Sequence, residues 1–162
     1  MSYKFEWPKP ESEADETILR NVRKQGCHIV AIPRDERGPG YAFSIGLFAN
    51  YGHAEIVIFG LRSDTSAKII NDVRDRAAAG HQFVDGDISD NILEGGYKVC
   101  FWEVPLEAYG SYLGTTIWFY AKSPRPFPCL QIIWQDRDGR FPWEAGCIPK
   151  VKADQPLLKT VS

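Results

Sequence analysis

The stretch Leu130-Gln-Ile-Ile-Trp-Gln-Asp-Arg-Asp-Gly-Arg-Phe-Pro-Trp143 combines an apolar run, a turn signal and three aromatic residues. The run over residues 130–134 is apolar enough for a buried strand. Asp138-Gly139 is a preferred pair for a two-residue hairpin turn. We therefore expect residues 140–143 to return as the second strand of a hairpin.

Upstream of this hairpin, helix-like and strand-like segments alternate. Ser12 is suited to cap a helix over residues 12–25, and Gly26 is suited to end it. Apolar and β-branched runs predict further strands, and apolar residues spaced by three and four predict further helices. The strands are expected over residues 27–33, 41–47, 54–60 and 97–104, and the helices over 64–79 and 105–113.

The strand over residues 41–47 has one bulky face and one face of small residues, Ala42, Ser44 and Gly46. A small-residue face lets a helix, another backbone segment or a ligand come close. We expect a helix there, with a bound ligand as the alternative. The strand over 54–60 and the helix after it fit either half of a βαβ crossover or the helical layer of an α+β sandwich.

Together these segments predict an α+β fold with a mainly antiparallel sheet of about six strands and two or three packed helices. A length of 162 residues favours a single domain. We place that domain at residues 12–147, after an irregular N-terminal arm over 1–11 and before an irregular C-terminal tail over 148–162.

The composition disfavours binding to nucleic acids or membranes. The net charge is −2 and the pI is about 5.9, whereas nucleic-acid-binding domains carry a basic face or a pI above about 9. The chain has no run of about eighteen apolar residues and no apolar signal core at its N-terminus. The four cysteines lack C-x-x-C spacing, which favours small buried residues in a reducing cytoplasm over a zinc knuckle. We therefore expect a cytoplasmic protein.

Three blocks of sequence carry a resemblance to a known family. They are Phe43-Ser-Ile-Gly-Leu47, then His53-x-Glu55 with the apolar run to Leu61, and then Gln131-x-x-Trp134-x-Asp136-x-x-Gly139-Arg140-Phe141-Pro142-Trp143. In this order and spacing they resemble the bacterial family called domain of unknown function 4262, over about residues 26–147. The resemblance implies a small bacterial protein and supplies no catalytic residues. Segments 44–47 and 55–57 are also similar to the suppressor-of-fused and immunity-protein group.

Ser44, His53 and Glu55 are the candidate catalytic residues. If the strand begins at His53, then His53 and Glu55 point to one face, where a carboxylate can orient an imidazole as a general base. A surface pair at the entrance of the strand explains the same two residues. Ser44 lacks the G-x-S-x-G pattern of a nucleophile elbow, which disfavours hydrolase chemistry.

No motif indicates a cofactor or a metal. The chain contains neither G-x-G-x-x-G nor G-x-x-x-x-G-K-[ST], and its three histidines do not follow a metal-binding spacing. The segment Asp85-Gly-Asp-Ile-Ser-Asp90 lacks the residue order of a calcium loop, so we expect a solvated loop, with a weak divalent site as the alternative. Flavin binding stays open because it requires no compact motif.

Trp134, Asp136, Arg140 and Trp143 are the candidate ligand-binding or partner-binding residues. Across the expected turn, Arg140 and Trp143 can flank Trp134, and Arg140 can pair with Asp136 or Asp138. A hairpin that merely closes the sheet explains the same residues. The leading hypothesis is a binding domain for a protein partner or a small molecule, with an immunity or conflict-system role as its sharpest form. The alternative is a small enzyme, with or without a cofactor, whose pocket lies between the catalytic candidates and the hairpin.

Overall fold

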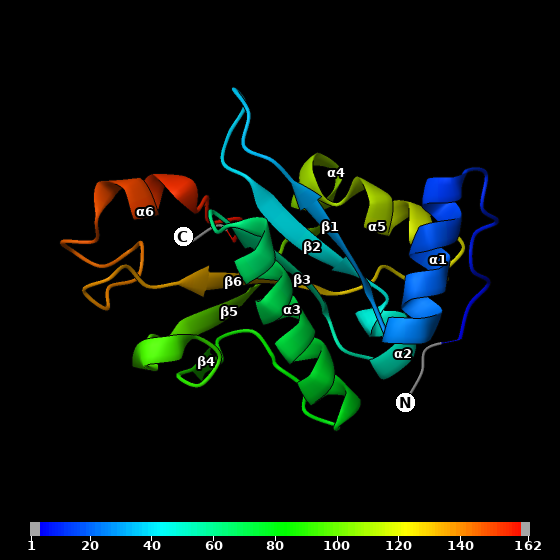
Figure 1. The fold of residues 1–162 in the computed structure, drawn as a ribbon, viewed down its shortest axis with the longest axis horizontal. Helices are drawn as coiled ribbons and strands as arrows, with labels where there is room; N and C mark the ends of the chain where they lie inside the picture. Colours follow the sequence, from blue (N-terminus) through cyan, green and yellow to red (C-terminus); the bar gives the residue numbers. More distant parts are fainter. Residues whose placement is uncertain (1–3, 160–162) are drawn as a thin grey trace.

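A six-stranded mixed sheet forms the centre of the computed structural model, which describes residues 4–159 (Figure 1). Its strands are β1 (His28–Ile32), β2 (Tyr41–Ile45), β3 (Glu55–Phe59), β4 (Ile88–Ser89), β5 (Val99–Glu103) and β6 (Cys129–Trp134). The helices are α1 (Glu13–Gln25), α2 (Leu47–Tyr51), α3 (Ser63–Ala78), α4 (Tyr109–Tyr112), α5 (Gly114–Phe119) and α6 (Pro149–Asp154). Short 3-10 helices lie at residues 94–96 and 106–108. The predicted α+β class is confirmed.

The strands follow the order β1-β2-β3-β6-β5-β4 across the sheet. Only the central pair, β3 and β6, is parallel, and the other neighbours in this order are antiparallel. Strands β1, β3 and β6 therefore run in one direction, and their carboxyl ends meet at the same edge of the sheet. Within residues 4–159 no helix has the length and the apolar composition required to cross a membrane.

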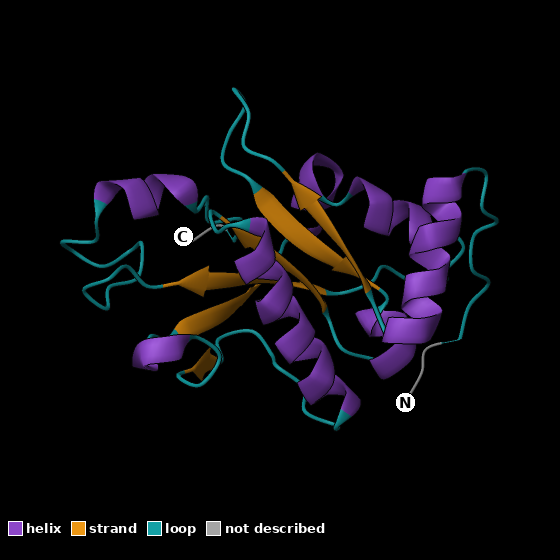
Figure 2. Cartoon of the chain, in the orientation of Figure 1, coloured by secondary structure: helices purple, strands orange, loops and turns teal. Residues whose placement is uncertain are grey.

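The two faces of the sheet are covered by different helices (Figure 2). On one face α3 packs through Ile70 and Val73 onto Ala42 and Ile58, so the helix predicted against the small-residue face of β2 is confirmed. The opposite face carries the bulky side chains of β2, including Phe43, and these pack against α1, α4 and α5. Both layers bury aliphatic and aromatic surface, which supplies the main driving force for folding.

The end of the sheet formed by β5 and β6 has a thinner cover. A small cluster of Cys100, Ile133 and Phe141 is buried there, with Trp102 and Leu157 partly buried against it. Phe141 and Leu157 come from the segment after β6, which takes the place of a helical layer. Apolar surface at this end is therefore only partly removed from solvent.

The predicted hairpin at 130–143 does not form. The turn at Asp138-Gly139 is present, with Gly139 at a φ of 78°, but residues 140–143 adopt coil and turn instead of a strand. The Asp136 carboxylate accepts the backbone N–H groups of Asp138 and Arg140 at 2.9 Å. These bonds hold the chain in a local loop. Because the Arg140 N–H group is bonded to Asp136, it is not available for pairing with a neighbouring strand.

The number of helices also exceeds the prediction of two or three, since α2 and α5 were not predicted and α6 lies in the tail expected to be irregular. Each of these three helices spans five or six residues, which is too short for a helical repeat to be visible in the sequence. Residues 4–11 form neither helix nor strand, and residues 1–3 and 160–162 lie outside the described part.

Gly46 joins β2 to α2 at a φ of 111°, and a Cβ added there would lie 2.7 Å from Cγ1 of Val22. We expect Gly46→Ala to lower the free energy of unfolding by about 2–4 kcal/mol, through left-handed backbone strain and overpacking. Gly110→Ala is the matched control, because no atom lies within 4 Å of its added Cβ. Urea unfolding of both variants tests this, and equal losses would contradict the explanation.

Candidate functional site

Glu55 opens β3 with a carboxylate that is almost completely buried, at 1% exposure. Its oxygens accept backbone N–H groups from Gly46 at 3.0 Å and from Leu47 and Phe48 at 3.2 Å. These are the groups that the first turn of α2 leaves without partners inside the helix. A buried carboxylate on β3 therefore caps the helix that follows β2, and the positive end of the helix dipole favours its charge.

Two hydroxyl groups complete the shell of this carboxylate. Ser44 donates to Oε1 of Glu55 at 2.7 Å, and Tyr120, which follows α5, donates to Oε2. Each hydroxyl oxygen also accepts a backbone N–H group. The Ile56 N–H donates to the Ser44 hydroxyl at 2.9 Å, and the Ala49 N–H donates to the Tyr120 hydroxyl at 3.1 Å. We call Ser44, Glu55, Tyr120 and the first turn of α2 the Glu55 cluster.

The electrostatics of the Glu55 cluster suit a fixed structural group. Burial raises the pKa of Glu55, while the hydrogen bonds from Tyr120 and Ser44 oppose that rise. Burial and the nearby Glu55 also raise the pKa of Tyr120, so its hydroxyl stays protonated and donates. Ser44 is 0% exposed, so its hydroxyl is closed off from solvent in this structure.

His53 forms its hydrogen bonds with backbone groups outside the Glu55 cluster. Its Nδ1 donates to the carbonyl of Ala54 at 2.7 Å, and its Nε2 accepts the N–H of Phe83 at 3.1 Å. These two bonds require a neutral ring with the proton on Nδ1. Burial lowers the pKa of His53, in agreement with the neutral form. The structure thus brings Ser44 and Glu55 together, while His53 ties the entrance of β3 to the segment after α3.

Asp136 organises the loop after β6. The carboxylate is 2% exposed and accepts three backbone N–H groups, those of Asp138 and Arg140 at 2.9 Å and that of Ile148 at 2.8 Å. Removal from solvent acts to raise the pKa of Asp136, but these backbone bonds outweigh it and lower the pKa. An ionised Asp136 therefore fixes both ends of the segment that carries Arg140 and Trp143.

The two tryptophans of this region lie on different sides of the sheet. Trp134 packs against the α3-side core and donates from Nε1 to the carbonyl of Phe59 at 2.8 Å. Trp143 instead stacks on Trp102 and Phe141, with ring centroids 4.5 Å and 4.7 Å away. Arg140 donates to the carbonyl of Gly146 at 3.2 Å within the loop. The four candidates therefore do not form one continuous surface, and Trp143 lies on an open cavity.

That cavity has a volume of about 650 Å³, and we call it the aromatic recess. Its walls are apolar apart from one amide and one ammonium group, and Trp143 in its wall is 42% exposed. The lining residues are Trp102, Pro142, Trp143, Lys152, Gln155, Pro156 and Leu157. Sequence analysis missed Trp102, Lys152 and Leu157. Period two within β5 places Trp102 and Cys100 on one face, but nothing local links them to Trp143.

The carboxylates Asp85 and Asp87 in the loop after α3 are bonded to groups of the protein itself. Asp85 forms an ion pair with Lys159 at 2.8 Å and accepts the N–H of Glu103, and Asp87 accepts the N–H of Val84. Across residues 4–159 no group of three or more His, Cys, Asp and Glu side chains is placed to hold a metal ion. The geometry therefore assigns these carboxylates to loop closure.

We expect Tyr120→Phe to lower the free energy of unfolding by about 2–4 kcal/mol, because Glu55 loses a donor and the Ala49 N–H loses its acceptor. Tyr109→Phe is the control, since this hydroxyl only donates to the carbonyl of Phe127, at 2.8 Å, and its removal should cost about 1 kcal/mol. Chemical denaturation provides both values. Equal losses would show that the Glu55 cluster does not depend on Tyr120.

We also expect the free energy of unfolding to fall as the pH drops below 6.5, the ordinary pKa of histidine. The folded-state pKa of His53 is lowered by burial, so unfolding takes up a proton in the window between that lowered value and 6.5. Burial of His28 adds to this effect. His53→Gln should show a smaller decline between about pH 7 and pH 5, and an unchanged decline would contradict the assignment to His53. Thermal unfolding across this range tests the slope.

Comparison with known proteins places the chain in a family. No curated protein and no solved structure matches it. The family model described as "Domain of unknown function (DUF4262)" matches residues 21–148 of the 162-residue chain. This match includes the Glu55 cluster, the loop organised by Asp136, and Trp143. The chain therefore belongs to the DUF4262 family.

Proposed function

We propose that this chain is a non-catalytic binding domain and that the aromatic recess receives an apolar side chain of a protein partner. The observation that carries the proposal is the partly exposed indole of Trp143, stacked on Trp102 and Phe141 beside an open apolar cavity. Tryptophans in this setting dominate the binding energy of many protein interfaces. The sharpest form of the proposal is an immunity or conflict-system role in the bacterial cytoplasm.

The walls of the recess are held in place before any partner arrives. Asp136 fixes the loop that carries Trp143 through three backbone bonds. Gln155 is 2% exposed and exchanges two hydrogen bonds of 3.0 Å with the backbone of Trp134, which anchors the end of α6 to β6. A preformed wall supports binding because little side-chain freedom is lost on association.

Positive charge beside the recess favours an acidic partner. Lys152 is part of the recess wall, and the ammonium of Lys159 lies 5.8 Å from the centre of the Trp102 ring. Asp85 neutralises Lys159 at 2.8 Å, whereas Lys152 forms no ion pair within residues 4–159. Charge complementarity therefore supports an apolar side chain that neighbours an Asp or Glu on the partner.

In this proposal the other candidate catalytic and binding residues stabilise the fold and do not contact the partner. Ser44 and Glu55 satisfy each other inside the core, and His53 is neutral and bonded at both ring nitrogens. Trp134, Asp136 and Arg140 shape the loop next to the recess.

Selection of a displayed random-peptide library on the wild-type protein, with counter-selection on Trp143→Ala, tests the proposal. We expect enriched peptides to pair a large apolar residue with a neighbouring Asp or Glu. Their affinity should fall about tenfold or more in Trp143→Ala and should also fall in Lys152→Glu. Trp118→Ala, which alters a partly exposed tryptophan on α5, should bind as the wild type does.

Two outcomes would contradict the proposal. Peptides that bind Trp143→Ala as well as they bind the wild type would place the interface elsewhere. A recess that binds small aromatic carboxylates, measured by tryptophan fluorescence, while no peptide is enriched would replace the protein partner with a small ligand. The unfolding midpoint of Trp143→Ala in urea must stay close to the wild-type value for either comparison to count.

A further inference from the structure

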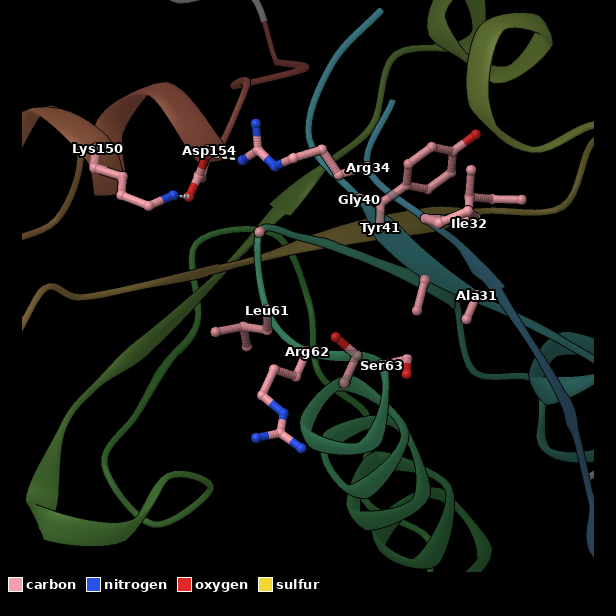
Figure 3. A pocket seen from close by; sticks show the side chains of 14 residues that line it. Ala31, Ile32, Arg34, Gly40, Tyr41, Leu61, Arg62, Ser63, Lys150 and Asp154 are labelled. Atoms are coloured by element: carbon pink, nitrogen blue, oxygen red, sulfur yellow. Dashed lines mark hydrogen bonds and ion pairs between the residues drawn. The ribbon is translucent and has the colours of Figure 1, made fainter. Parts of the chain in front are cut away.

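A second cavity lies where the carboxyl ends of β1 and β3 meet α6 and the first turn of α3, and Figure 3 shows it from close by. Its volume is about 490 Å³, and we call it the edge cavity. Open sheets with parallel strands place ligands at the carboxyl ends of those strands. The edge cavity occupies this position, and it shares no lining residue with the aromatic recess.

The first turn of α3 borders the edge cavity. This helix spans sixteen residues, and its N-cap residue, Arg62, makes no side-chain cap bond. The Asp64 carboxylate accepts one N–H group of the first turn, that of Thr65, at 2.9 Å. Within residues 4–159 the backbone N–H groups of Ser63 and Asp64 have no hydrogen-bond partner. Free N–H groups and the positive end of the helix dipole both favour an anion at this position.

A buried hydroxyl group in the wall provides an independent indication of a ligand. Ser66 lines the edge cavity and is only 1% exposed. Its hydroxyl has no hydrogen-bond partner in the described part of the chain. Among residues 4–159 no fully buried side-chain nitrogen or oxygen atom lacks a partner. The Ser66 hydroxyl therefore reaches the cavity, where it is free to bond a group bound inside it.

The charged groups around the edge cavity leave a net positive charge. Arg34, Arg62 and Lys150 line it, together with the carboxylate of Asp154. Asp64, in the first turn of α3, pairs with Arg62 at 3.3 Å, so three cationic groups face two carboxylates. Figure 3 shows Arg34 and Lys150 reaching Asp154 from two sides, and the Lys150 pair measures 2.8 Å. The side chains of Arg34 and Lys150 are 57% and 77% exposed, whereas that of Asp154 is 12% exposed. Either cation can therefore turn toward an anion while the other keeps the buried carboxylate paired.

Gly60 allows these elements to approach one another. It follows β3 with a φ of 84°, and a Cβ there would lie 2.9 Å from the carbonyl oxygen of Asp154. Only glycine therefore fits between the end of β3 and α6 without a shift of the backbone. The close approach brings the Lys150 side of α6 opposite the N-terminus of α3.

The rest of the wall is apolar. Ile32, Tyr41 and Leu61 line the edge cavity beside the charged groups. Its volume exceeds that of a single inorganic anion and is in the range of small-molecule sites. A suitable ligand thus combines a compact anionic group with an organic body.

The geometry points to a binding site for a small organic phosphate, with its phosphoryl group at the first turn of α3 and its body against Ile32, Tyr41 and Leu61. The Ser63 and Asp64 N–H groups and the Ser66 hydroxyl donate to the phosphoryl oxygens. Lys150 and Arg34 add charge from the opposite wall. Phosphate suits this donor set better than a carboxylate does, because it offers more acceptor oxygens and a second negative charge.

Titration of the ¹⁵N-labelled full chain with phenyl phosphate, inorganic phosphate and sodium chloride at matched ionic strength tests this site. We expect saturable shifts of the amide signals of residues 63–66 with both phosphates. Phenyl phosphate should bind more tightly and should also shift the signals of Ile32, Tyr41 and Leu61. Shifts that chloride reproduces, or that lie outside the cavity, would overturn the proposal.

Two exposed lysines provide matched variants. Lys150→Gln should weaken phenyl phosphate binding about tenfold, the loss expected for a charge-assisted bond, whereas Lys68→Gln should leave it unchanged because Lys68 lies on α3 and does not line the edge cavity. Ser66→Ala should weaken binding severalfold without destabilising α3. Equal effects of Lys150→Gln and Lys68→Gln would show that only the general charge of the protein matters, and would overturn the site. These readouts do not depend on peptide binding at the aromatic recess, so the two proposals fail separately.

Discussion

The buried carboxylate of Glu55 is the constraint around which the central part of this fold is arranged. It joins β3, the turn at Gly46, the first turn of α2 and the hydroxyl of Tyr120 in one set of hydrogen bonds. A charge or a set of backbone N–H groups left unsatisfied in this position would be costly. The network therefore fixes the positions of α2 and α5 relative to the sheet. Its residues hold these elements together in the core.

The parallel pair of β3 and β6 then decides where ligands can approach. Because α3 follows β3 through Gly60 and the loop of Asp136 follows β6, the start of α3 and this loop both lie beyond the carboxyl ends of the two parallel strands. Helix α6 packs between them. Lys150 and Asp154 line the edge cavity, while Lys152 and Gln155 line the aromatic recess, so one short helix contributes to two proposed sites of opposite chemistry.

Much of the fold could be predicted because its signals are local. The cap at Ser12 forms, with the Asp15 N–H bonded to the Ser12 hydroxyl at 3.1 Å, and the small-residue face of β2 packs against α3 as expected. The return of residues 140–143 as a strand was wrong because Asp136 takes backbone groups of its own loop, and a turn signal does not report such competition. The short helices could not be predicted because a helix of one or two turns is too short to show a repeating pattern of apolar residues in the sequence.

The sequence by itself determined the α+β class, the long helices, most strands and membership of the DUF4262 family. Each of these depends on residue patterns within one segment or on the order of a few blocks. Only the tertiary structure decided that Ser44 bonds Glu55 while His53 does not, and that Trp143 stacks on Trp102. It alone brought Lys150 and Ser66 to one cavity. Such contacts join residues far apart in the chain, and their geometry depends on strand order and packing, which no local pattern encodes.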